Sequence, residues 1–150
     1  MNSTEHNKPE GMPLHDMLIT VRWGDMDALG HVNNIMYFRF FETVRMSWFE
    51  ALGSSGVATG DDGIVIVDNH AEYIEPVVCP ADVLVRMCGH SPGKSSFVST
   101  YTITQEEKLM TRGSARIVWI NNAKMKSAPL PDSIRSQLTG SGNANGVSGV

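Results

Sequence analysis

Polar side chains gather in one short stretch of the sequence, directly before its most apolar segment. Residues 24–34 read Gly-Asp-Met-Asp-Ala-Leu-Gly-His-Val-Asn-Asn, and aromatic and aliphatic side chains dominate the residues that follow. At the start of a helix, such groups would lie beside unpaired backbone N–H donors that attract negative charge. Asp25 and Asp27 could serve there as bases or nucleophiles, or simply as turn formers. His31 could orient a carboxylate or a water molecule.

Two elements must position this stretch. Before it, residues 17–23 alternate between apolar and polar side chains, a period of two that is typical of a half-buried strand. After it, residues 34–52 are predicted to form a helix, with Asn33 as the N-cap and Gly53 as the stop signal. This helix is apolar around most of its circumference, so it must be buried. Its polar side chains are expected on the remaining outer side: Arg39, Glu42, Thr43, Arg45, Ser47 and Glu50.

Most of the remaining chain is predicted to form β-strands. Four strands are expected, at residues 64–75, 82–90, 95–105 and 109–121. A hairpin with a longer loop, around residues 105–108, joins the last two, and the tight connections require an antiparallel meander. A short helix could follow within residues 129–138. The expected fold is α+β, in which a curved antiparallel sheet of about five strands wraps around one long buried helix.

The chain is expected to form a single domain. Its 150 residues are enough for one hydrophobic core and too few for two. The domain is predicted over residues 16–138, after a polar and flexible lead of residues 1–15. Residues 139–150 are low in complexity and are expected to be disordered. The exposed edges of the predicted sheet could pair in a dimer.

Charge and composition argue against several classes of protein. The formal charge is −4 and the basic residues are dispersed, so no nucleic-acid surface is expected. No apolar run reaches the roughly 18 residues of a membrane span, and the first residues lack a secretory signal, so a cytoplasmic location is expected. Cys79 and Cys88 lack metal-binding spacing and are expected to be buried, reduced thiols. Asp25, Asp27 and His31 offer too few oxygen ligands for a hard cation, so no metal site is expected.

Three segments of the chain match the pattern of one known family. They are residues 24–34 with Tyr37 and Glu42, residues 70–76 (His-Ala-Glu-Tyr-Ile-Glu-Pro) and residues 93–97 (Gly-Lys-Ser-Ser-Phe). Together with the order of helix and strands, they resemble the hotdog-fold acyl-CoA thioesterases of the 4-hydroxybenzoyl-CoA thioesterase type. The resemblance spans residues 15–135, and it implies a hotdog fold and a thioester hydrolase.

The resemblance implies a role for each matching residue. The second aspartate of the Asp-x-Asp pair is the catalytic carboxylate of that family, and Asp27 holds this position. A backbone N–H at the start of the buried helix polarises the thioester carbonyl, a role that falls to Asn34, with Ile35 as a further donor. Lys94 and Ser96 lie in the turn that commonly contributes to coenzyme A binding.

Three further residues belong to the candidate site. Glu42 holds a helix position that is a carboxylate facing the acyl group in the hydroxybenzoyl enzyme, although it could also pair with an arginine three residues away. Tyr37 is expected to contact the substrate, and His31 is grouped with the catalytic residues. Asp27 could act as a general base on water or attack the thioester directly to give an anhydride.

The resemblance also implies the partners. The substrate is an acyl-CoA, so coenzyme A is part of the substrate and no separate cofactor is expected. The protein is expected to be a homodimer or a tetramer with pockets at the subunit interfaces. The hydroxybenzoyl enzymes carry an aromatic residue in place of Asn34, so an aromatic acyl group is not favoured.

Three alternatives stay open. Residues 31–34 resemble those of plant acyl-carrier-protein thioesterases, although the functional Asn of those enzymes corresponds to Leu29. Acyl-carrier protein is therefore a second candidate carrier. Hotdog hydratases that act on enoyl thioesters also use an Asp and a His, with a different spacing. A non-catalytic module that binds acyl thioesters is the third alternative.

Overall fold

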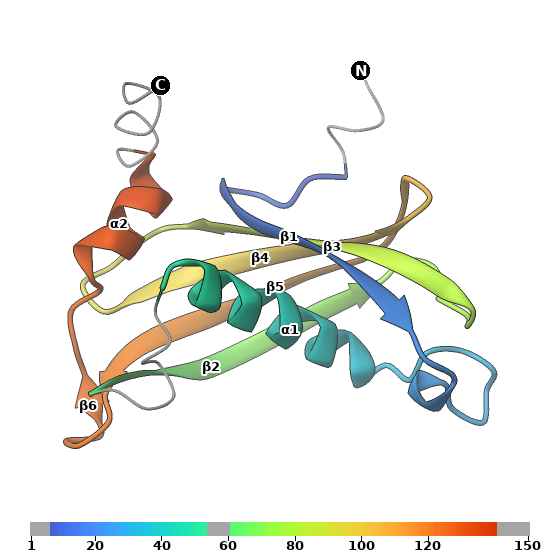
Figure 1. Ribbon diagram of the computed structural model, residues 1–150, viewed down its shortest axis with the longest axis horizontal. Helices are drawn as coiled ribbons and strands as arrows, with labels where there is room; N and C mark the ends of the chain where they lie inside the picture. Colours follow the sequence, from blue (N-terminus) through green and yellow to red (C-terminus); the bar gives the residue numbers. More distant parts are fainter. Residues whose placement is uncertain (1–6, 54–60, 141–150) are drawn as a thin grey trace.

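A curved antiparallel sheet wraps around one long helix (Figure 1). The computed structural model describes residues 7–53 and 61–140. Within these residues the elements are, in chain order, β1 (Met12–Val21), η1 (Trp23–Asp25), α1 (Met36–Ala51), β2 (Asp62–Tyr73), β3 (Ala81–His90), β4 (Ser96–Gln105), β5 (Lys108–Asn121), β6 (Lys126–Ser127) and α2 (Asp132–Thr139). The predicted α+β architecture is confirmed, and every predicted strand and helix is present.

Within the described residues, the sheet has six strands in the order β1-β3-β4-β5-β2, with β6 paired to β5. Strands β3, β4 and β5 form the predicted meander, whereas β1 pairs with β3 and β2 pairs with β5. The sequence does not predict β6, because two residues carry no periodic pattern. Strand β2 lies at one edge of the sheet, and it is the strand that follows α1 in the chain.

The β4–β5 hairpin differs from the prediction. Its loop consists of Glu106 and Glu107, because Gln105 pairs directly with Lys108. Both loop residues have positive φ angles, 49° and 68°. This is the conformation of a two-residue type I′ turn, which usually contains Asn or Gly. Two glutamates give no such signal, so the prediction of a longer loop is wrong.

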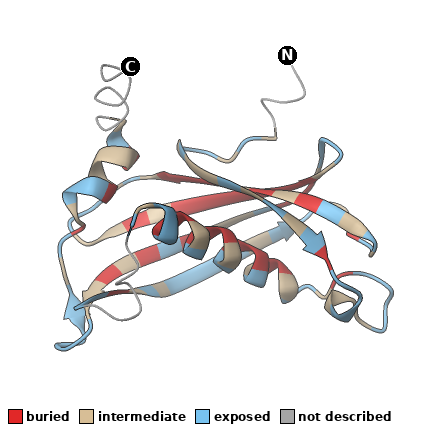
Figure 2. Ribbon diagram, in the orientation of Figure 1, coloured by how far each residue is buried: buried red, intermediate tan, exposed pale blue. Residues whose placement is uncertain are grey.

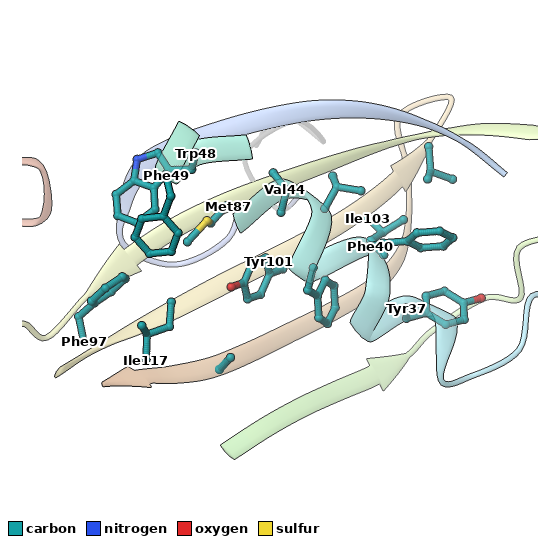
Figure 3. Packing of buried hydrophobic residues seen from close by; sticks show 14 of the residues in the cluster. Tyr37, Phe40, Val44, Trp48, Phe49, Met87, Phe97, Tyr101, Ile103 and Ile117 are labelled. Carbon is teal, nitrogen blue, oxygen red and sulfur yellow. The ribbon is translucent and has the colours of Figure 1, made fainter. Parts of the chain in front are cut away.

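Helix α1 packs its aromatic face against the inward face of the sheet (Figure 2). Phe41 and Val44 are 0% exposed, and Trp48 and Phe49 are 1% exposed. The sheet meets them with fully buried side chains: Val83, Val85, Met87, Phe97, Ile103 and Ile117. Figure 3 shows this cluster running from Trp48 and Phe49 at one end to Tyr37 at the other. Each large apolar side chain buried here contributes about 1.5–3 kcal/mol, so helix and sheet hold each other in place.

One charged residue of α1 lies in the core. Arg45 is 4% exposed, whereas the sequence pattern places it on the outer side of the helix. Its Nη1 donates a hydrogen bond of 2.9 Å to the Tyr101 hydroxyl, which donates one of 2.7 Å to Ser99 Oγ. Ser99 in turn donates to the Ala115 carbonyl at 2.9 Å. The prediction is wrong because the apolar stem of an arginine can pack in a core when its head finds polar partners.

Strand β1 begins earlier than predicted. Residues 12–15 belong to the strand rather than to a flexible lead, and residues 1–6 lie outside the described part of the chain. Pro13 and a register shift between Pro13 and His15 interrupt the alternating pattern, which is why the sequence hides this part of the strand. Trp23 lies in the 3-10 helix η1 and is 85% exposed, so it does not belong to the buried face of the strand.

The predicted C-terminal helix is present, and the prediction for the cysteines holds in part. Helix α2 confirms the predicted short helix and includes Thr139, while residues 141–150 lie outside the described residues. Cys79 and Cys88 are both free, and Cys88 is buried as expected, whereas Cys79 is only partly buried. Burial, and to a lesser extent the carboxylate of Asp16, raises the pKa of the Cys88 thiol to about 11. No helix within the described ranges is long and apolar enough to cross a membrane.

Candidate active site

The polar loop folds back on itself and is tied to the β2–β3 connection. The Asp27 N–H donates to the His31 carbonyl at 2.9 Å, and the Gly30 N–H donates to the Asp27 carbonyl at 3.0 Å. Gly30 has a φ of 82°, a conformation that favours glycine, where the loop turns back on itself. The Val32 N–H donates to the Val77 carbonyl at 2.8 Å, which anchors the loop to the β2–β3 connection.

Asp25 holds the base of this loop. Its Oδ2 accepts a hydrogen bond of 2.8 Å from the Arg22 N–H, and its carbonyl accepts one of 2.9 Å from the Asn33 N–H. Asp25 thus ties the chain after β1 to the turn that precedes α1. These contacts give Asp25 a structural role, one of the two roles that its residue type allows.

Asp27 is oriented by one of its two carboxylate oxygens. Its Oδ1 accepts a hydrogen bond of 2.8 Å from the Leu29 N–H. Among the described residues, its Oδ2 has no hydrogen-bond or salt-bridge partner. His31 is exposed, and no hydrogen bond within the described chain joins its ring to Asp27. The loop therefore presents an oriented carboxylate with one oxygen available to a ligand or water.

A tight turn of residues 33–36 joins the loop to α1. The helix begins at Met36, two residues later than predicted. The Met36 N–H donates to the Asn33 carbonyl at 2.8 Å, and the Ile35 N–H donates to Asn33 Oδ1 at 3.1 Å. Asn33 therefore caps this turn rather than the first residue of the helix. The Ile35 N–H already donates to Asn33 Oδ1, so the expectation that Ile35 is a second donor to the substrate is wrong.

The N–H of Asn34 is the exception in this turn. Of the main-chain groups of residues 33–35, it alone has no hydrogen-bond partner in the described structure. The bond from Met36 to the Asn33 carbonyl polarises the peptide that carries this N–H, which strengthens it as a donor. It also lies near the positive end of the α1 macrodipole. The turn thus offers a preorganised donor to an anion.

These groups line one cavity of about 530 Å³. It brings together four of the predicted site residues: Asp27, His31, Asn34 and Tyr37. Its opposite wall is formed by residues 73–76, at the end of β2. The cavity lies at the end of the core that Tyr37 marks in Figure 3. The residues predicted for catalysis therefore meet at the N-terminal end of the buried helix.

Two tyrosines form the wall between the helix and β2. Tyr37 is 3% exposed, and its hydroxyl accepts a hydrogen bond of 3.3 Å from the Val77 N–H. The ring of Tyr73 meets it edge to face, with the ring centroids 5.0 Å apart. Burial raises the pKa of both phenols, and Tyr37 adds to the shift at Tyr73. Both hydroxyls are therefore protonated at neutral pH and can donate hydrogen bonds.

Three predicted site residues lie away from this cavity in the described chain. The Glu42 carboxylate lies 4.0 Å from the Arg39 guanidinium, and its side chain is 57% exposed. Lys94 lies in the β3–β4 connection and Ser96 is the first residue of β4, beside α2 and at the opposite end of the sheet from the polar loop (Figure 1). There the Lys94 carbonyl accepts a hydrogen bond of 2.9 Å from the Leu130 N–H.

Residues 73–76 line the site, although the sequence assigned them no role there. They belong to a segment that carries the family resemblance, which was the available signal. The hydrogen bond from Tyr73 to the Asn34 carbonyl could not be predicted locally, because it joins residues 39 positions apart. Glu75 is paired with Lys108 at 2.8 Å.

Among residues 7–53 and 61–140, no group of three or more His, Cys, Asp or Glu side chains could hold a metal ion.

Comparison with known proteins identifies the family. The model of the thioesterase-like superfamily matches residues 21–138. The chain is 28% identical over 141 residues to the 1,4-dihydroxy-2-naphthoyl-CoA hydrolase of Synechococcus sp. (strain CC9605). This alignment covers 86% of the chain and 92% of the relative.

Solved structures give the same result. The PA2801 protein of Pseudomonas aeruginosa, a suggested thioesterase, is 39% identical, with a TM-score of 0.78 over 83% of this chain and 97% of that one. A thioesterase of Thermus thermophilus, solved with coenzyme A and Zn, is 26% identical, with a TM-score of 0.74 over 86% of this chain and 93% of that one. With its sheet wrapped around a single buried helix, the chain belongs to the thioesterase-like superfamily and is a hotdog-fold thioester hydrolase.

Proposed function

We propose that this protein hydrolyses acyl-CoA thioesters to a carboxylic acid and coenzyme A. One observation carries the proposal: Asp27 Oδ2 and the Asn34 N–H, both unpaired within the described chain, belong to residues that line the same cavity. The relatives support coenzyme A as the carrier. One is named as the hydrolase of a CoA thioester, and another was solved with coenzyme A bound.

In this proposal the Asn34 N–H binds the carbonyl oxygen of the thioester. That oxygen becomes an anion as a nucleophile adds, and a preorganised donor stabilises the anion more strongly than the ground-state carbonyl. Removing one donor of this kind typically lowers kcat by about 10²–10³-fold. Because the donor belongs to the main chain, the side chain at residue 34 is free to vary.

Asp27 supplies the nucleophile in one of two ways. As a general base, it takes a proton from a water molecule that attacks the thioester carbon, and the tetrahedral intermediate then expels the thiolate of coenzyme A. As a nucleophile, it attacks that carbon itself, expels the thiolate and forms a mixed anhydride that water hydrolyses. Borohydride trapping followed by mass spectrometry distinguishes these routes, because the second alone forms an acyl anhydride on Asp27.

The acyl group lies against the apolar wall of the cavity that includes Tyr37. No cofactor beyond the coenzyme A of the substrate takes part in either route. The Synechococcus relative is named for a dihydroxynaphthoyl thioester, so aromatic acyl groups belong in a substrate panel beside aliphatic ones. The acyl preference follows from the relative rates across that panel.

The active enzyme in this proposal is a homodimer or a tetramer. Strand β2 is a 12-residue edge strand, and its Val65 and Val67 are 40% and 53% exposed. A long exposed edge of this kind is prone to pair with another strand. A second copy could then bring its Lys94 and Ser96 to the cavity, which the same residues do not line in one chain as described. A monomer with full activity, measured by light scattering at assay concentration, would contradict this part.

Thiol release from a panel of acyl-CoAs, from acetyl to palmitoyl and including 4-hydroxybenzoyl, tests the proposed activity. Asp27→Asn removes the working charge, and Asp16→Asn is the matched control. Asp16 lies on β1, 3.6 Å from Arg86, with a side chain that is 57% exposed. We expect wild type and Asp16→Asn to hydrolyse at least one substrate, and Asp27→Asn to lose about 10²–10⁴-fold in kcat. Hydrolysis by Asp27→Asn at the wild-type rate would overturn the proposal.

A further inference from the structure

The hydroxyl of Tyr73 reaches the turn that carries the proposed oxyanion donor. Tyr73 is the last residue of β2, and its hydroxyl donates a hydrogen bond of 2.6 Å to the Asn34 carbonyl. In a regular helix this carbonyl would accept from the N–H of residue 38. The Phe38 N–H instead bonds to the Ile35 carbonyl at 3.2 Å. The Asn34 carbonyl is therefore left out of the helical ladder and is taken by Tyr73.

Hydrogen bonds hold the peptide groups before and after Asn34. In the peptide group before it, the Asn33 carbonyl accepts from the Met36 N–H. In the peptide group after it, the Ile35 N–H donates to Asn33 Oδ1, and the Asn34 carbonyl accepts from Tyr73. Both peptide groups that flank the Asn34 Cα are thus fixed by hydrogen bonds before any substrate arrives. A donor that is fixed in advance stabilises a developing oxyanion best, because no reorganisation is needed during the reaction.

Packing does not require this hydroxyl. Tyr73 is 45% exposed, and its contact with Tyr37 is made by the rings. A phenylalanine would keep the ring contact. Asn34 is exposed, so its carbonyl could bond to water if the hydroxyl were removed, which makes the stability cost small. The hydroxyl therefore contributes to the placement of the turn more than to the stability of the fold.

We propose that Tyr73 is a positioning residue of the thioesterase site, and that its hydroxyl holds Asn34 so that the Asn34 N–H meets the substrate carbonyl. This inference rests on the role proposed above for Asn34. It extends the working site from the polar loop and α1 to the end of the edge strand β2. Tyr73 acts through Asn34 and need not touch the reacting atoms.

Tyr73→Phe tests the inference, with Tyr101→Phe as the matched control. The control removes the same hydroxyl from a tyrosine in the core, where it accepts from Arg45 and donates to Ser99. Kinetics use the acyl-CoA that wild type hydrolyses fastest, at a temperature at which all variants are folded. For Tyr73→Phe we expect kcat to fall about tenfold, with KM within about twofold and Tm within about 2 °C of wild type. For Tyr101→Phe we expect a lower Tm and a kcat within about twofold of wild type.

Binding of two substrate analogues separates positioning from general damage. A trifluoromethyl ketone analogue of the same acyl-CoA mimics the oxyanion, and a thioether analogue mimics the ground state. Tyr73→Phe should weaken the ketone about tenfold and leave the thioether unchanged, because the donor matters most in the transition state. Equal weakening of both analogues would overturn the inference.

Two kinetic results would also overturn it. One is a Tyr73→Phe enzyme with the wild-type kcat. The other is a fall in kcat that accompanies a loss of Tm as large as that of Tyr101→Phe, which would show a structural role. If wild type hydrolyses none of the acyl-CoAs, the proposed function fails and this inference fails with it, a result that differs from failure of the Tyr73 variant alone.

Discussion

The hydroxyls of Tyr101 and Tyr73 belong to two different polar networks, the first in the core and the second at the site. In the core, Arg45 donates to Tyr101, Tyr101 donates to Ser99, and the series ends at a backbone carbonyl. At the site, Tyr73 donates to the Asn34 carbonyl, while the N–H of the same residue has no partner among the described residues. The first network ends on a protein acceptor, and the second leaves one donor for a ligand.

This difference separates structural from chemical use of polar groups. A buried donor without a partner costs about 1–3 kcal/mol, so a polar network in a core must be satisfied. At the mouth of the cavity this cost is avoided, because Asn34 is exposed and water can reach it. Substitutions in the core network are therefore expected to change stability, and substitutions in the site network to change activity.

The largest expected effect on stability is in the core. Phe41 is 0% exposed and stacks on Tyr101, with the ring centroids 4.6 Å apart. Phe41→Ala should lower the free energy of unfolding by about 3–5 kcal/mol, because it leaves a cavity. Leu29→Ala, at the cavity and 81% exposed, should change it by less than about 0.5 kcal/mol. Urea unfolding measures both, and similar losses in the two variants would break the distinction.

A smaller loss is expected at Gly113 of β5, which lies against the ring of Phe41. A Cβ added at Gly113 would lie 2.3 Å from the Phe41 ring and 2.8 Å from the His70 carbonyl oxygen. Gly113→Ala should therefore lower the free energy of unfolding by about 1–3 kcal/mol. Gly93→Ala is the control, because its nearest heavy atom would be 3.4 Å away. Equal thermal stability of the two variants would show that β5 and α1 can move apart without cost.

The cap at the entrance of α1 should contribute about 1 kcal/mol, although it lies beside the site. Asn33→Ala removes the acceptor of the Ile35 N–H and should lower the free energy of unfolding by this amount, whereas Asn33→Asp keeps an acceptor at the same position. Thermal unfolding compares the two variants. If Asn33→Asp loses as much stability as Asn33→Ala, the cap contributes nothing through its oxygen.

The smallest expected effect is the pH dependence of stability that Tyr101 contributes. Burial raises the pKa of Tyr101 above its ordinary value of 10.0, an effect that Arg45 and Ser99 offset in part. Above pH 10 the unfolded phenol ionises while the folded one stays protonated. The stabilisation is therefore full below pH 10 and is lost as pH rises toward the folded pKa. The difference in unfolding free energy between wild type and Tyr101→Phe should shrink above pH 10, and a constant difference up to pH 11 would contradict this.

Local sequence patterns explain the features that could be predicted. Strands β2 to β5 begin and end within two residues of their predicted positions, because alternation along a strand is a local property. The joint placement of Asp27 and Asn34 was also predictable, since a polar loop directly before an apolar helix places both at the start of that helix.

Long-range contacts account for what the sequence missed. Tyr73 meets Asn34 only because β2 and the start of α1 come together from positions 39 residues apart. The charged guanidinium of Arg45 favours an exposed position. Its side chain is nevertheless buried, because the guanidinium donates a hydrogen bond to the Tyr101 hydroxyl in the core. Lys94 and Ser96 lie at the far end of the sheet, a separation that follows from the course of the whole chain and not from a local motif.

The backbone N–H of Asn34 is the group on which the proposed catalysis depends most directly. Asn34→Ala keeps this N–H, and Asn34→Pro removes it at the second position of the turn of residues 33–36, where proline is favoured. The measurement is kcat with the fastest acyl-CoA substrate, with Tm as the check of folding. Asn34→Ala should stay within about threefold of wild type, and Asn34→Pro should lose about 10²–10³-fold while it keeps its Tm. Equal kcat values for the two variants would contradict a role of this N–H in thioester hydrolysis.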